Sequence, residues 1–296
     1  MSTRCGFVAL VGRPNVGKST LLNALVGEKI SIVTPKPQTT RHRINGIRTE
    51  GRTQLVFVDT PGLHRQAGKP LNAAMNRAAT ASLSDVDVVV LVVEAGRWTE
   101  EDDFVLEHLH TLACPVGVVL NKVDRVPQRE RLLPEIERLS QRHPFAFVVP
   151  LSARRGENVT ALLAELKALA PAGPFLYPTD QPTDRSERFL VSETVREKLV
   201  LALHDELPYE LAVEVERFRR DAGLLRIDAV VWVGKANHKA MVIGRGGRVL
   251  KHVGERARRE LETRFSQKVF LRLWVKVKED WHGDERALRA LGLDES

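Results

Sequence analysis

The feature that most constrains this chain is a glycine-bounded segment near its start. Residues 12–19 read GRPNVGKS and fit the pattern G-x-x-x-x-G-K-[ST], between an apolar run at 7–11 and a helical pattern at 19–26. Glycines let backbone N–H groups turn inward around an anion, and a helix N-terminus adds partial positive charge there. The segment therefore predicts a strand, a phosphate-binding loop and a helix. The alternative, an ordinary glycine-rich turn, would not require Lys18 and Ser19.

Apolar runs alternate with longer helical patterns through the first part of the chain. Runs rich in β-branched residues, typical of buried strands, lie at 55–58, 86–93, 116–120 and 145–149. Helical patterns lie at 71–83, 100–109, 129–142 and 158–169. This alternation predicts an α/β domain with a mostly parallel sheet and helices on both faces. Ligands of such sheets bind at the carboxyl ends of the strands.

A Pro-rich, polar stretch divides the 296 residues into two parts, which agrees with about 150 residues per domain. We predict a first domain at 1–171, a linker at 172–184 and a second domain at 185–296. The second part has the order helix, strand, strand, short helix, glycine-rich turn, basic helix, strand. Apart from the short helix, these elements are expected at 187–204, 211–218, 224–233, 244–247, 248–265 and 269–277.

The formal net charge of +7 is unevenly distributed. Residues 235–278 contain 13 Lys and Arg against 3 Asp and Glu, a net charge of +10, so the rest of the chain carries −3. A focused excess of this kind favours a site for a polyanion. On charge alone, a solvated basic helix face is an equally good explanation.

Cysteine content and hydropathy exclude several classes of protein. Two cysteines, Cys5 and Cys114, provide neither a disulfide framework nor a zinc set, and they suit a reducing cytosol. The strongly apolar run at 86–93 is interrupted by Asp87 and is far shorter than the roughly 20 residues that span a bilayer. The first residues lack the pattern of a signal peptide. We therefore expect a cytoplasmic protein.

Two further motifs follow predicted strands and complete a nucleotide site. Asp59-Thr60-Pro61-Gly62 places a carboxylate where it can reach Mg²⁺ through water, and a glycine N–H where it can meet a γ-phosphate. Asn121-Lys122-Val123-Asp124 favours guanine, because one carboxylate can accept both N1–H and the exocyclic amine. Adenine offers no such pair of donors, so we expect strong rejection of ATP.

The remaining contacts to the base have separate sources. Asn121 should tie the base-binding loop and approach the purine, and the Lys122 stem can cover the ring. Ser152-Ala153 follows a predicted strand, and the Ala153 N–H can donate to guanine O6. The candidate nucleotide-binding residues are Gly12, Arg13, Pro14, Asn15, Val16, Gly17, Lys18, Ser19, Thr20, Thr39, Thr40, Asp59, Thr60, Pro61, Gly62, Asn121, Lys122, Asp124, Ser152 and Ala153.

With these four motifs in this order, the chain resembles a GTPase of the translation-factor class. The resemblance implies that Lys18 bridges the β- and γ-phosphates and that Ser19, Asp59 and a threonine of the first switch bind Mg²⁺. The first switch is expected at 28–43, where Thr40 is favoured over Thr39, and part of the second switch at 64–69. A threonine there would order the loop only with GTP.

One residue of that class is missing. Leu63 follows Gly62 where Ras-like enzymes have the glutamine that orients water, so we expect slow intrinsic hydrolysis. Asn15 is a candidate partner of a potassium ion that would act in place of an arginine finger, although it can also be a simple turn residue. The candidate catalytic residues are Asn15, Lys18, Thr40 and Gly62.

The second part contains a G-x-x-G loop, Gly244 to Gly247, inside the order αββααβ, which resembles a type II KH domain of α+β class. Glycines let the backbone approach RNA phosphates, and nearby cations give the charge of +10 a structural location. Ile243 also fits the small core. The candidate RNA-binding residues are Lys235, Lys239, Ile243, Gly244, Arg245, Gly246, Gly247, Arg248 and Lys251.

A GTPase domain that carries QTTRHR at 38–43 and is followed by a KH domain resembles the Era family of ribosome-assembly GTPases. The segments at 188–193, 206–209, 274–278 and 285–292 match that family too, while Arg245-Gly246 departs from its usual loop centre. The resemblance implies a monomer that binds near the 3′ end of small-subunit ribosomal RNA. It also implies roles in RNA processing and small-subunit assembly, and peripheral contact with the cytoplasmic membrane face.

Two other functions remain open from the sequence. The chain could bind RNA and use the nucleotide only for structure, which Leu63 makes conceivable and the set Lys18, Ser19, Thr40 and Asp59 argues against. It could also be a GTPase of membrane or cell-division function whose basic helix binds anionic lipid. If the chain is a switch, we expect RNA to bind more tightly to the GTP-loaded protein than to the GDP-loaded protein.

Overall fold

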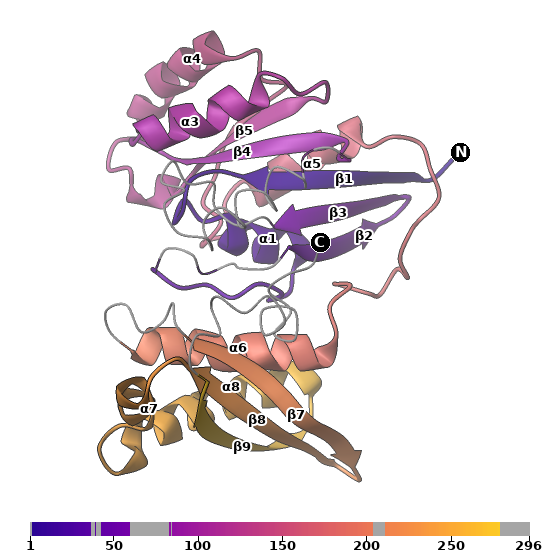
Figure 1. Cartoon of the computed structure of the whole chain (residues 1–296). Coiled ribbons are helices and arrows are strands. Elements are labelled where there is room, and N and C mark those ends of the chain that lie inside the picture. Colours follow the sequence, from indigo (N-terminus) through magenta and orange to yellow (C-terminus); the bar gives the residue numbers. More distant parts are fainter. Residues whose placement is uncertain are drawn as a thin grey trace. The chain divides into compact units, whose positions relative to one another are not determined.

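A computed structural model describes residues 2–36, 39, 43–59, 83, 85–203 and 211–278. The chain divides into two compact units, Met1–Asp184 and Arg185–Ser296, and each is described by itself (Figure 1). Within the described residues, no helix combines the length and the apolar character that crossing a membrane requires.

The first unit is a six-stranded sheet in the order β2-β3-β1-β4-β5-β6. β2 is antiparallel to β3 and the other neighbours are parallel, which confirms the predicted mostly parallel sheet. The strands are β1 Arg4–Val11, β2 Ile44–Glu50, β3 Thr53–Asp59, β4 Val88–Glu94, β5 Val116–Asn121 and β6 Val148–Pro150.

Helices cover both faces of this sheet (Figure 1). α3, Glu100–Leu109, and α4, Leu132–Arg142, bury Leu106, Leu109 and Leu139 against β4 and β5. α1, Lys18–Val26, and α5, Val159–Leu169, pack against β1 and β3 on the other face. The predicted helix at 71–83 lies mostly outside the described residues.

β2 has no counterpart in the sequence-based prediction. Its residues are buried or half-buried, with Glu50 exposed, and follow no clear period of two. The tight turn at Gly51 and Arg52 joins it to β3 as a hairpin, with Glu50 opposite Thr53. A local turn, rather than a hydrophobic pattern, therefore creates this edge strand.

The predicted linker at 172–184 is fastened to the first unit. The backbone N–H of Ile47 donates to the Pro182 carbonyl at 2.8 Å, and the Thr183 hydroxyl donates to the Asn45 carbonyl at 2.7 Å. The fully buried Gln54 accepts from the N–H groups of Leu176 and Tyr177. The segment therefore forms an ordered border of the first unit along β2 and β3.

The second unit has the predicted order αββααβ. β7 is antiparallel to β8, β8 is parallel to β9, and α6 packs against α8. The core joins the three helices to the inner sheet face through Val195, Leu199, Val231, Val253 and Val275, among others. The elements are α6 Glu187–Ala202, β7 Leu211–Asp221, β8 Leu224–Val233, α7 Ala236–Ile243, the short 3-10 turn Arg245–Gly247, α8 Arg248–Phe265 and β9 Lys268–Val277.

Burial of the strand that carries the base-binding motif gives a test of this fold. Leu120 in β5 is 0% exposed, whereas Leu133 in α4 is 67% exposed. We expect Leu120→Ala to destabilise the first unit by about 2–5 kcal/mol and Leu133→Ala by less than about 0.5 kcal/mol. Hydrogen exchange with mass spectrometry in urea would resolve the two units. Equal effects of the two substitutions would contradict the packing of β5.

Candidate functional site

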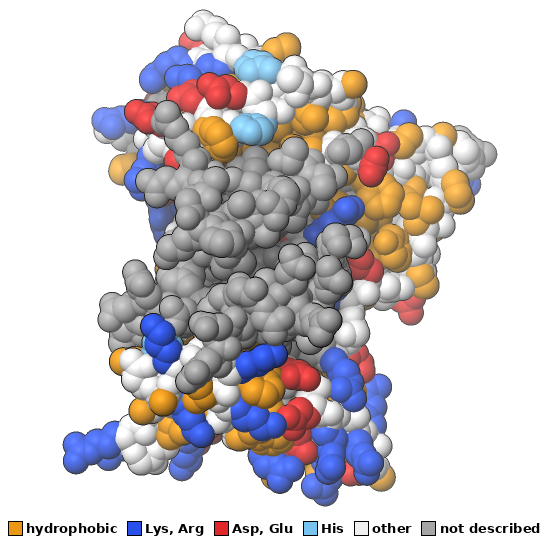
Figure 2. Space-filling model, in the orientation of Figure 1, with side chains coloured by type: hydrophobic (Ala, Val, Ile, Leu, Met, Phe, Trp, Pro, Cys, Tyr) orange, Lys and Arg blue, Asp and Glu red, His pale blue; other side chains and the backbone are white. Residues whose placement is uncertain are grey.

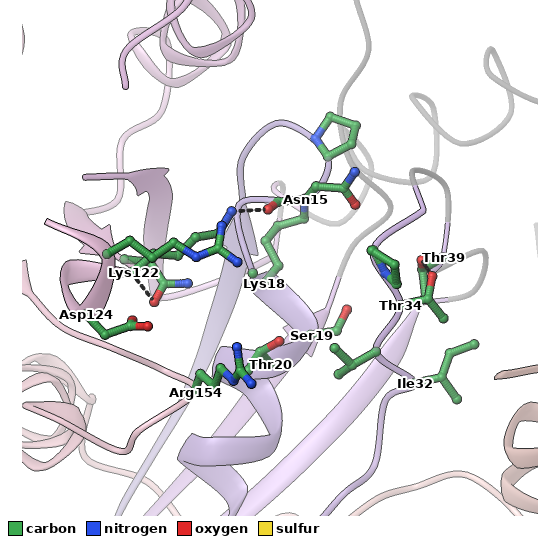
Figure 3. A pocket seen from close by; sticks show the side chains of 16 residues that line it. Asn15, Lys18, Ser19, Thr20, Ile32, Thr34, Thr39, Lys122, Asp124 and Arg154 are labelled. Carbon is green, nitrogen blue, oxygen red and sulfur yellow. Dashed lines mark hydrogen bonds between the residues drawn. The ribbon is translucent and has the colours of Figure 1, made fainter. Parts of the chain in front are cut away.

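A pocket of about 510 Å³ lies where β1 and β5 end (Figure 3). Its walls come from the phosphate loop, the segment after α1, the base-binding motif and Arg154. The lining residues are Pro14, Asn15, Gly17, Lys18, Ser19, Thr20, Ile32, Val33, Thr34, Pro35, Thr39, Asn121, Lys122, Asp124, Arg125 and Arg154.

The phosphate loop depends on glycine at position 17. Gly17 has φ 103°, and an added Cβ would lie 2.4 Å from Nδ2 of Asn121. The Lys18 ammonium, which is buried, donates to the carbonyls of Gly12 at 2.7 Å and Arg13 at 3.0 Å. Burial lowers the pKa of Lys18 to about 8, against the opposing charge of Asp59. A bound phosphate would favour the charged form.

Oxygen groups suited to a hard cation gather beside the lysine. The Ser19 hydroxyl and the Ser31 hydroxyl each donate to Oδ2 of the fully buried Asp59 at 2.9 Å. Hydroxyl and carboxylate oxygens are the donors that Mg²⁺ prefers, and Mg²⁺ needs few protein ligands when it also binds phosphates. The residues present therefore fit Mg²⁺.

Ser31 is a site residue that the sequence analysis missed. Its backbone N–H donates to Oδ1 of Asn23 at 2.9 Å, and its carbonyl accepts from Nδ2 of Asn23 at 2.8 Å. Asn23 on α1 thereby holds the following loop against β3. No local motif marks Ser31, because its partner Asp59 is 28 residues away.

The base-binding residues lie at the other end of the pocket. The Ser152 hydroxyl donates to Oδ1 of Asp124 at 2.6 Å. This hydrogen bond keeps the pKa of Asp124 below its usual value, so the carboxylate is charged at neutral pH. The Asn121 side chain donates to the Val16 carbonyl at 2.8 Å and so joins the base-binding motif to the phosphate loop.

Two predicted residues have partners that the sequence did not indicate. The Ala153 N–H donates to Oδ1 of Asn121 at 3.0 Å, so a contact to guanine O6 would have to share or replace that bond. Arg13 is 6% exposed, and its side chain contacts Asp102 instead of lining the pocket. The predicted contribution of Arg13 is therefore limited to its backbone, because its guanidinium is held beneath the loop.

The other predicted residues divide by position. Thr39 lines the pocket, with its hydroxyl 2.6 Å from that of Thr34, while Gly12 and Val16 support the loop without lining it. Ile32, Val33, Thr34, Arg125 and Arg154 line the pocket without having been predicted individually. The residues Thr40, Thr60, Pro61, Gly62 and Leu63, and the second switch at 64–69, lie outside the described residues.

The glycine-rich turn of the second unit joins α7 to α8. Gly244 has φ 72°, and an added Cβ would lie 2.4 Å from a Val249 methyl group, so only glycine fits. An added Cβ at Gly246 or Gly247 would meet no atom within 4 Å, so the loop backbone is open to a ligand. Ile243, which the sequence offered either as an RNA-binding residue or as a core residue, packs against the core.

Five exposed cations surround this turn: Lys235, Lys239, Arg245, Arg248 and Lys251. In the described part of the chain none of them forms an ion pair. Lys and Arg side chains are also prominent on the second unit in Figure 2. Unpaired, solvated cations around an open backbone suit phosphate groups of a polyanion.

Comparisons with known proteins find related sequences over both units. The family model described as a 50S ribosome-binding GTPase matches residues 7–122, and a KH domain model matches residues 206–282. The chain is 51% identical to GTPase Era of Pseudomonas aeruginosa over 98% of this chain and 95% of that protein. It is 50% identical to GTPase Era of Azotobacter vinelandii over 100% of this chain and 98% of that protein.

Two solved structures are similar over almost the whole chain. A single-residue variant of Aquifex aeolicus Era bound to GDP·AlF4⁻ is 36% identical, with a TM-score of 0.93 over 99% of this chain and 100% of that chain. Era in complex with MgGDPNP and nucleotides 1506–1542 of 16S ribosomal RNA is 36% identical, with a TM-score of 0.94 over the same shares. Pocket, glycine-rich turn and full-length similarity together lead to one conclusion: this chain belongs to the Era family of GTPases, with a GTPase domain followed by a KH domain.

Proposed function

We propose that the chain is a GTP-driven switch that binds small-subunit ribosomal RNA near its 3′ end and acts in processing of that RNA and assembly of the small subunit. The observation that carries this proposal is the full-length similarity to Era in complex with MgGDPNP and 16S ribosomal RNA. The pocket and the unpaired cations supply the two surfaces that such a protein needs.

The nucleotide would bind with its phosphates at the loop and its base at Asp124. Lys18 would leave the carbonyls of Gly12 and Arg13 and donate to the β- and γ-phosphates, because a phosphate oxygen carries more charge than a carbonyl. The charged Asp124 would accept from N1–H and the exocyclic amine of guanine. Lys122, fixed between two oxygens, would lay its stem on the ring.

Hydrolysis would proceed by in-line attack of water on the γ-phosphate. Mg²⁺ would be held by Ser19, Asp59 and one threonine, Thr40 or Thr39. When bound, the ion neutralises charge on the phosphates. Lys18 and loop N–H groups would stabilise the charge that develops during transfer. Gly62 would contact the γ-phosphate. Since Leu63 cannot orient water, the intrinsic rate would be slow.

The cellular setting follows from the same proposal. A protein that acts in assembly of the small ribosomal subunit would work in the cytoplasm. The two free thiols, Cys5 and Cys114, are compatible with a reducing compartment. We also propose that it acts as a monomer and touches the membrane face only peripherally, through its basic surface.

Base selection gives the first prediction here. Asp124→Asn replaces an acceptor pair by one donor and one acceptor, which match the C2 oxygen and N1–H of xanthine. We expect GDP affinity to fall by about a hundredfold and xanthosine diphosphate affinity to rise, measured by calorimetry. Asp103→Asn is the control, because Asp103 pairs with Arg142 and does not line the pocket. Unchanged GDP affinity in Asp124→Asn would refute the assignment.

Monovalent cations give the second prediction. Asn15 has φ 62°, and its side chain lies in the pocket while Lys122 holds its carbonyl (Figure 3). We expect GTP turnover to be about tenfold faster in potassium than in sodium at equal ionic strength, and Asn15→Ala to abolish the difference. Asn158→Ala is a matched control, because Asn158 also has positive φ and lies outside the pocket. Equal turnover in the two salts would exclude a potassium role.

RNA binding gives the third prediction. We expect Arg245→Glu with Lys251→Glu to weaken binding of an RNA that spans nucleotides 1506–1542 by about a hundredfold. Lys268→Glu with Lys278→Glu is the matched control: the same charge change, on β9 and the residue after it, outside the glycine-rich turn.

The affinity of the wild-type protein for this RNA should be higher with GDPNP than with GDP at fixed salt. Loss of vesicle binding with intact RNA binding would favour the lipid alternative.

A further inference from the structure

Two acidic residues outside the pocket hold the middle of the phosphate loop from beneath. They are Glu94, the last residue of β4, and Asp102, in the first turn of α3, and we call them the acidic anchor. Neither lines the pocket. Asp102 contacts Arg13 directly, and Glu94 reaches Asn15 through Lys122. Arg13 and Asn15 flank Pro14 in the loop.

Asp102 holds Arg13. Both oxygens of the fully buried Asp102 carboxylate accept from Nε of Arg13, at 3.0 and 3.1 Å. The backbone carbonyl of the same residue, Arg13, accepts from the Lys18 ammonium at 3.0 Å. The position of the carbonyl that Lys18 contacts therefore depends on a carboxylate 89 residues away in sequence.

Glu94 connects the two loops that bind a nucleotide. Its Oε2 accepts from the Lys122 ammonium at 2.8 Å and lies 3.6 Å from the Arg13 guanidinium. The same ammonium donates to the Asn15 carbonyl at 2.7 Å. One carboxylate thus fixes the lysine of the base-binding motif and, through it, the residue of the phosphate loop that adopts φ 62°.

The network is half-buried at Glu94 and Lys122, and buried at Asp102 and Arg13. Burial raises the pKa of Glu94, but the hydrogen bond and charge of Lys122, with Arg13 and Arg125, bring it below its usual value. Removal of one carboxylate would leave a buried or half-buried cation without that partner, and the cation would then move toward another acceptor. Lys122 and Arg13 have nearby backbone carbonyls or water as the alternatives.

We propose that Glu94 and Asp102 are positioning residues for the nucleotide, acting through Lys122 and Arg13. This inference rests on the proposed nucleotide site. It assigns to β4 and α3 a role that the pocket itself does not reveal: they set the geometry of the phosphate loop and the base-binding loop together. The anchor touches no atom of the base, so it should affect nucleotides without discriminating among purines.

The dissociation rate of a fluorescent GDP from the full chain tests the anchor. We expect Glu94→Gln and Asp102→Asn each to speed release about tenfold, because a cation that positions a nucleotide-binding loop loses its charged hydrogen-bond partner. Asp103→Asn, the same change on the next residue of α3, should leave the rate within about twofold. Release of inosine diphosphate, which lacks the exocyclic amine, should rise by the same factor as release of GDP.

Two double-substitution cycles separate positioning from general destabilisation. In a Lys122→Met background, which keeps the stem and removes the charge, Glu94→Gln should have less than about twofold effect. In an Arg13→Met background, Asp102→Asn should likewise change the release rate by less than about twofold. Asp102 also accepts hydrogen bonds from Thr99 at the start of α3, so this cycle separates its contact with Arg13 from its role as a helix cap. Full tenfold effects in these backgrounds would overturn the proposal.

The outcomes distinguish the two levels of inference. Wild-type protein that fails to bind the fluorescent GDP would refute the nucleotide site and the anchor with it. Wild-type binding with unchanged release from Glu94→Gln and Asp102→Asn would refute the anchor alone. If an acidic variant does not fold, Lys122→Met and Arg13→Met test the same contacts from the basic side and should speed release similarly; unchanged release would overturn the proposal.

Discussion

The parallel order of the central strands is the constraint on which the nucleotide site depends. Because β1, β3, β4 and β5 run in one direction, their polar ends meet at one edge: Leu10 pairs with Asp59, and Glu94 pairs with Asn121. The interiors of these strands are apolar and buried, and the polar groups of the site, such as Asp59 and Asn121, stand at the last residues of their strands. The phosphate loop, the carboxylate beside Ser19 and the base-binding motif are consequences of that geometry.

The two units use charge in different ways. In the first unit, two cations beside the nucleotide loops are paired with carboxylates: Lys122 with Glu94, and Arg13 with Asp102. Such pairs fix side chains in low dielectric surroundings and orient backbone groups for a small ligand. In the second unit, the cations around Gly244 extend into solvent without carboxylate partners among the described residues, which suits an extended polyanion.

Local patterns predicted most elements because the responsible contacts are themselves local. α3 begins and ends as predicted, at Glu100 and Leu109, since Thr99 and Asp102 form a capping box before an amphipathic run. The bounds of β8 and α8 also agree with the prediction, whereas β2 was missed because a turn and a partner strand define it. The motif residues of the pocket were predictable for a similar reason: glycine, lysine and asparagine occur at spacings that the chemistry of phosphate and guanine requires.

The sequence by itself determined the class of the two domains, the nucleotide chemistry and the location of the basic site. Only the tertiary structure decided which partners the side chains take. It turned Arg13 away from the pocket toward Asp102, brought Ser31 to Asp59, gave the Ala153 N–H to Asn121 and fastened the segment at 172–184 to β2 and β3. The physical reason is distance along the chain: a hydrogen bond between residues 28 to 138 positions apart leaves no local period or spacing in sequence.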